Sequence, residues 1–83
     1  MSITVYSKPQ CPQCSLTKRK LRDEGAQYTD VDVSEDKAAF EFIMGLGWRQ
    51  APVVVVRDDD DDGQITDHWS GFRPDRIEKV VRR

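Results

Sequence analysis

The fold of this chain is decided by residues 3–33, which read ITVYSKPQCPQCSLTKRKLRDEGAQYTDVDV. The stretch opens with a short β-prone run that stops at Pro9, as expected of a first strand. From Pro12 onward, leucines and long-stemmed side chains predict a helix that Gly25 can end as a C-cap. Residues 27–33 then alternate apolar and polar side chains, which is typical of a second strand. The stretch therefore predicts a βαβ unit with its pair of cysteines where the first strand meets the helix.

The remainder of the chain predicts four further elements. Ser34 is expected to cap a second helix that ends near Gly47. Residues 53–56 are consecutive valines, which indicates a central strand covered on both faces. A hairpin returning over 64–69 and a last helix starting at Pro74 complete the order βαβαββα. With the usual right-handed crossover, this order predicts an α/β fold, in which three helices flank a four-stranded mixed sheet on both faces.

Length and composition narrow the class of protein. A chain of 83 residues suits one core, so we expect a single domain over 1–83, and nothing demands more than a monomer. No run approaches the about 20 apolar residues that span a bilayer, and no basic leader opens the chain, which favours a cytoplasmic protein without membrane contact. A net charge of -2 gives no reason to expect nucleic-acid binding. Proteins or small molecules are the expected partners.

The strongest chemical signal is Cys11-Pro12-Gln13-Cys14 at the predicted helix start. The spacing permits a tight disulfide, and amides at a helix N-terminus stabilise a thiolate. Cys11 is therefore expected to have a lowered pKa and to attack a substrate disulfide, after which Cys14 resolves the mixed disulfide. Lys8 could add positive potential near the thiolate, although a solvent-facing lysine is its commoner role.

A zinc site and a calcium loop are the two metal-binding alternatives, and each lacks ligands in this sequence. Two cysteines at this spacing also supply the first two ligands of many zinc sites. A zinc site in this chain would need His68 and a carboxylate as its other ligands, which is an uncommon structural set. The acidic run Asp58 to Asp62 fits the first half of a calcium loop, yet the twelfth position is Trp69 rather than glutamate. A solvated hairpin tip is the better interpretation of that run. No metal is expected.

Pro52 is ambiguous when the residues alone are considered. It lies just before the valine strand, where a proline cannot donate to the ladder and could hold a cis turn. Without other information, a trans Ala51–Pro52 bond is the expectation.

Three separated blocks carry a resemblance to a known family. They are YSKPQCPQC at residues 6–14, QAPVV at 50–54 and WSGFRPD at 69–75. Together they resemble the glutaredoxin-like proteins of the thioredoxin superfamily, and most closely the NrdH-redoxins. The resemblance implies a thioredoxin-like fold and no cofactor beyond the Cys11–Cys14 disulfide. It also implies reduction by thioredoxin reductase and electron delivery to class Ib ribonucleotide reductase.

The resemblance further assigns roles around the cysteines. It makes Pro52 a cis-proline that faces the disulfide. Phe72 takes the place of the second of two glycines in glutathione-using glutaredoxins, which argues against close approach of glutathione. A glutathione-coupled glutaredoxin, a general protein disulfide reductase and a metal-binding or interaction module remain the alternatives. Packing is an equal alternative for the aromatic rings. The residues assigned to substrate and partner binding are Lys8, Pro12, Gln13, Ala51, Pro52, Trp69, Ser70, Gly71 and Phe72.

Overall fold

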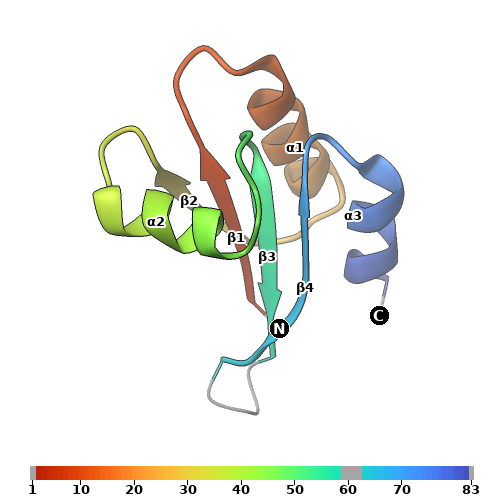
Figure 1. The fold of residues 1–83 in the computed structure, drawn as a ribbon. Coiled ribbons are helices and arrows are strands. Elements are labelled where there is room, and N and C mark those ends of the chain that lie inside the picture. The colour runs from red at the N-terminus through yellow and green to blue at the C-terminus, as the bar shows by residue number, and fades with distance from the viewer. Residues whose placement is uncertain (1, 59–62, 83) are drawn as a thin grey trace.

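The computed structural model describes residues 2–58 and 63–82, and its elements follow the order βαβαββα (Figure 1). They are β1 (Ser2–Ser7), α1 (Pro12–Asp23), β2 (Thr29–Asp32), α2 (Lys37–Gly45), β3 (Val53–Arg57), β4 (Ile65–Ser70) and α3 (Pro74–Val81). Within these ranges, no helix has both the length and the apolar character needed to cross a membrane. Most of the acidic run expected at the hairpin tip, residues 59–62, lies outside the described residues.

The strands form one 4-stranded sheet in the order β2-β1-β3-β4. β1 runs parallel to β2, and β3 runs antiparallel to both β1 and β4. Val5 pairs with Val54, which places the valine strand at the centre as predicted. The sequence prediction of a mixed sheet with this order of elements is confirmed.

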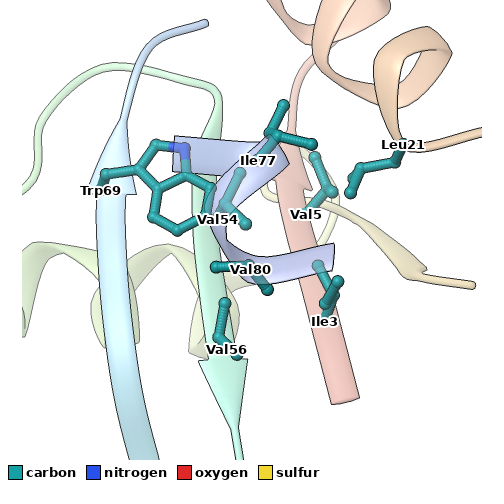
Figure 2. Close-up of a cluster of buried hydrophobic side chains, with 8 residues drawn as sticks. All are labelled: Ile3, Val5, Leu21, Val54, Val56, Trp69, Ile77 and Val80. Atoms are coloured by element: carbon teal, nitrogen blue, oxygen red, sulfur yellow. The ribbon is translucent and has the colours of Figure 1, made fainter. Parts of the chain in front are cut away.

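Alternation along the two central strands builds a core on each face of the sheet. Val54 and Val56 point toward α1 and α3, whereas Val53 and Val55 point toward α2. All four are fully buried, and burial of a valine side chain contributes about 1.5 kcal/mol or more. Figure 2 shows the core on the α1 and α3 face, which contains Ile3, Val5, Leu21, Val54, Val56, Trp69, Ile77 and Val80.

The start of α2 differs from the prediction. Its N-cap is Asp36, whose carboxylate accepts the backbone N–H of Ala39 at 3.0 Å. Ser34 lies in the turn before it, and both its amide and its hydroxyl donate to Asp32 Oδ1, at 2.8 and 2.6 Å. Ser34 is therefore not the cap, because Asp32 has already engaged its polar groups in a local turn.

Candidate active site

The cysteine pair lies at the N-terminus of α1, after the turn that follows β1. Cys11 is the N-cap residue, with φ -120° and ψ 100°, and Pro12 occupies the first turn, where its missing amide costs no helical bond. The backbone N–H of Cys14 donates to Cys11 Sγ at 3.2 Å. The sulfur thus takes the place that a serine or aspartate oxygen has in an ordinary cap. The predicted position is confirmed, and the amides there favour negative charge on a reduced Cys11.

The two sulfurs form a disulfide, with the Cα atoms 5.2 Å apart. Cys11 retains 9% of its surface and Cys14 only 1%. An incoming sulfur can therefore reach Cys11 first, whereas Cys14 lies beneath it. This difference matches the attacking and resolving roles that the spacing predicts.

The loop before β3 lies against the disulfide. The Ala51–Pro52 peptide is cis. The trans bond expected from the residues alone is therefore wrong, because the intrinsic preference of an X-Pro bond takes no account of tertiary contacts. The cis bond implied by the family resemblance is confirmed. The carbonyl oxygen of Ala51 lies 3.8 Å from Cys11 Sγ, and the ring of Pro52 is fully buried.

The end of β4 and the residue after it are bound to this loop by two hydrogen bonds. The N–H of Gly71 donates to the Pro52 carbonyl oxygen at 2.8 Å. The hydroxyl of Ser70 donates to the Gln50 carbonyl oxygen at 2.8 Å. Both bonds hold the loop that carries the cis-proline in one position beside Cys11.

Gln13, between the cysteines, connects the motif to the same segment. Its side-chain Oε1 accepts the backbone N–H of Phe72 at 3.1 Å. Gly71 has a φ of 85°, and a Cβ atom there would lie 3.3 Å from Gln13 Oε1. A larger residue at 71 would be strained and would crowd this amide. The cysteine turn, the cis-proline loop and the segment after β4 are thus joined into one site.

The two aromatic residues at and after the end of β4 differ in burial. Trp69 retains 3% of its surface and packs in the core of Figure 2, with the Arg76 guanidinium 5.2 Å from its ring centroid. Within the described residues, its indole N–H has no hydrogen-bond partner. Phe72 is only partly buried and packs at the edge of the same cluster. Burial supports a packing role for Trp69, whereas Phe72 keeps part of its surface exposed.

Cationic side chains border the grooves that flank Cys11. Lys8 borders the groove on either side of the sulfur and is exposed. Lys18 borders the groove along α1, and Arg49 borders the groove beside the cis-proline loop.

Lys18 is held in place by Asp30 of β2. Its ammonium lies 3.1 Å from Asp30 Oδ2, and the hydroxyl of Ser7 donates to Asp30 Oδ1 at 2.6 Å. Burial alone would raise the pKa of Asp30, but the hydrogen bonds from Ser7 and Lys18 outweigh it and hold that pKa below its ordinary value. Asp30 therefore stays ionised and keeps the Lys18 ammonium at the groove.

The residues considered for metal binding are arranged differently. Across 2–58 and 63–82, no group of three or more His, Cys, Asp or Glu side chains is placed to hold a metal ion. His68, the zinc ligand considered with the cysteines, accepts the indole N–H of Trp48 at Nδ1 with a distance of 2.8 Å. It is partly buried against α2's side of the sheet rather than free at the surface. The calcium alternative rests mainly on residues outside the described ranges.

The sequence and fold of this chain match known redox proteins. Residues 3–60 match the family model for Glutaredoxin. Over 80 residues the chain is 36% identical to the glutaredoxin-like protein NrdH of Escherichia coli K12, which covers 96% of this chain and 89% of that protein. NrdH of Lactococcus lactis subsp. cremoris is 32% identical over 79 residues, covering 95% of this chain and 99% of the relative. The chain belongs to the NrdH-type glutaredoxin-like proteins. It is therefore a thiol-disulfide oxidoreductase with a redox-active Cys11–Cys14 pair.

The solved structures agree with this membership. NrdH-redoxin from Escherichia coli, described as having a thioredoxin-like activity profile, superposes with a TM-score of 0.82 at 36% identity. The match covers 96% of this chain and 95% of that one. The thioredoxin-like fold implied by the resemblance is confirmed.

The structure gathers most of the predicted site residues and adds others. Besides the cysteines, the grooves beside the disulfide are bordered by Lys8, Pro12, Gln13 and Ala51. Sequence reasoning missed Arg49 and Gln50, which only their proximity to the predicted cis-proline could have indicated. It also missed the Lys18–Asp30 pair, for which the sequence holds no signal, because the contact depends on how α1 packs beside β2.

Proposed function

We propose that this protein reduces protein disulfides through Cys11 and Cys14, taking electrons from thioredoxin reductase and delivering them to class Ib ribonucleotide reductase. The observation that carries the proposal is the geometry of Cys11, whose sulfur caps α1 and accepts the Cys14 amide at 3.2 Å. Its greater exposure than Cys14 supports the order of attack. We infer that the reaction takes place in the cytoplasm with the protein as a monomer, without a cofactor, and without nucleic acid or membrane as a partner.

The exchange proceeds in two steps. The thiolate of Cys11 attacks one sulfur of the substrate disulfide, and the other substrate sulfur leaves as a thiolate that takes up a proton. Cys14 then loses its proton and attacks Cys11 Sγ, which forms the Cys11–Cys14 disulfide and releases the second substrate thiol. Two electrons pass from the protein to the substrate. The reductase, drawing on NADPH, returns the disulfide to the dithiol.

The choice of electron donor rests on the segment after β4. The Phe72 amide is bonded to Gln13, which lies between the two cysteines, and Phe72 replaces a glycine that, by the family resemblance, glutathione-using glutaredoxins have for close backbone approach. The thioredoxin-like activity profile of the Escherichia coli relative supports thioredoxin reductase as the donor. A glutathione-coupled glutaredoxin is the second candidate, favoured by the match of residues 3–60 to the Glutaredoxin family.

The test is NADPH oxidation with insulin as the disulfide acceptor. One arm contains thioredoxin reductase, and the other contains glutathione with glutathione reductase. We expect turnover in the first arm only, and its loss in Cys11→Ser. Turnover with glutathione alone would establish the second candidate instead, and turnover that survives in Cys11→Ser would contradict the mechanism. A positive first arm is followed by the same assay with class Ib ribonucleotide reductase as acceptor.

A further inference from the structure

The walls around Cys11 carry charge of one sign. The protein has a formal net charge of -2, yet within residues 2–58 and 63–82 no aspartate or glutamate lines either groove beside Cys11. Lys8 lines both grooves, Lys18 lines the groove along α1, and Arg49 lines the groove beside the cis-proline loop. The charged side chains that line these grooves therefore have the sign opposite to the net charge of the molecule.

Two of these cations lack a carboxylate partner among residues 2–58 and 63–82. Other basic side chains, including Lys18, Lys20 and Arg76, form ion pairs. Within 2–58 and 63–82, neither Lys8 nor Arg49 has an ion-pair partner, and both are exposed. Their charge is consequently available to a molecule that lies over the disulfide.

The two cations come from different segments of the chain. Lys8 lies in the turn after β1, and Arg49 lies in the loop that leads to the cis-proline. Both border the groove that contains Cys11, Pro12 and Ala51. A peptide lying in that groove with its disulfide on Cys11 meets a cation from each of these segments.

We propose that Lys8 and Arg49 select protein disulfides whose cysteines are flanked by acidic side chains. The inference rests on the proposed function, because it concerns the substrate of the same thiol exchange. Clefts lined by one sign of charge raise the association rate of oppositely charged ligands by about 10-fold to 10³-fold. Arginine also binds carboxylates in a bidentate manner, which adds orientation to attraction.

The test uses disulfide-linked dimers of a single-cysteine peptide, with Asp, Asn or Lys on both sides of the cysteine. Pre-reduced protein is mixed with each dimer, quenched by alkylation, and the second-order rate of peptide release is measured. Measurements at about 0.01 M and about 1 M salt set the screening length to about 30 Å and about 3 Å. The variants are Lys8→Gln/Arg49→Gln and, as a control, Lys79→Gln. This control removes another exposed cation, on α3, which has no ion-pair partner in the described part of the chain.

The decisive quantity is the ratio of the rates for the Asp and Asn peptides, since effects of a variant on Cys11 reactivity cancel in it. At low salt we expect this ratio to be about 10-fold higher in the natural protein than in the double variant. The difference should shrink at high salt, and Lys79→Gln should keep the natural ratio. Equal ratios in all proteins, or an equal fall in Lys79→Gln, would overturn the inference. Reduction of all three peptides at similar rates would leave the proposed function intact, whereas reduction of none would refute both.

Discussion

Replacing Gly71 with alanine tests how the segment after β4 is fitted to the cysteine motif. Gly71 has a φ of 85°, and a Cβ atom would lie 3.3 Å from the Gln13 Oε1 that accepts the Phe72 amide. An L-residue in the left-handed region costs about 1–2 kcal/mol. Loss of a hydrogen bond such as that of Gln13 costs about 0.5–1.5 kcal/mol. Alanine also lowers the conformational entropy of the unfolded chain, which offsets this loss by about 0.4–1 kcal/mol.

The expected net effect is a loss of about 1–2 kcal/mol in the free energy of unfolding, which lowers the Tm by about 4–16 °C for a domain of this size. Gly25→Ala is the matched control, because Gly25 has a φ of 76° but a Cβ atom there would meet nothing within 4 Å. We expect the control to lose less stability than Gly71→Ala, and the difference between them to report the contact with Gln13.

The assay is urea unfolding followed by circular dichroism, with the proteins in the disulfide form. The triple comparison of Gly71→Ala, Gln13→Ala and the double variant isolates the coupling between the two positions. A Gly71→Ala protein as stable as the natural one would show that neither backbone strain at residue 71 nor crowding of Gln13 destabilises the fold. Additive effects in the double variant would show that Gln13 and Gly71 do not act together.

Three further substitutions test other contacts. Asp36→Ala should destabilise the protein by about 1 kcal/mol through loss of the α2 cap, and more than Ser34→Ala does in the same urea assay. Trp48→Phe removes the donor to His68 and should cost about 0.5–1.5 kcal/mol, so an unchanged unfolding midpoint would show that this bond contributes nothing. Asp30 has a pKa lowered from 3.8, despite the opposing effect of burial. Its ionised form therefore contributes stability above that pH, which is lost as the pH falls through the lowered pKa. Asp30→Asn should thus lose less stability on acidification, and an acid transition identical to that of the natural protein would contradict this assignment.

The fold could be predicted from the sequence because its main elements have strong local signals. The valine run at 53–56 can be fully buried only in a strand covered on both faces, and the structure places it there. The N-cap residue of α2 could not be predicted from the local sequence in the same way. Ser34 and Asp36 are both good capping residues, and the choice between them depends on Asp32, which engages Ser34 in the preceding turn.

Only part of the candidate active site could be predicted from the sequence, for a related reason. The spacing of Cys11 and Cys14 and their place at a helix start are local properties, so the sequence indicates them directly. The pairing of Lys18 with Asp30 and the placement of Arg49 beside Cys11 join segments that are distant in the chain. Such contacts follow from the packing of helices and loops on the sheet, and residue patterns alone do not reveal them.

Attack by Cys11 and resolution by Cys14 can be tested by trapping the mixed disulfide. Reduced Cys14→Ser and Cys11→Ser proteins are each mixed with a disulfide-linked peptide dimer, and intact masses are recorded without reductant. We expect an adduct of one peptide unit on Cys14→Ser, mapped by proteolysis to Cys11, with little or none on Cys11→Ser. An adduct that forms faster on Cys14 of Cys11→Ser than on Cys11 of Cys14→Ser would contradict this expectation.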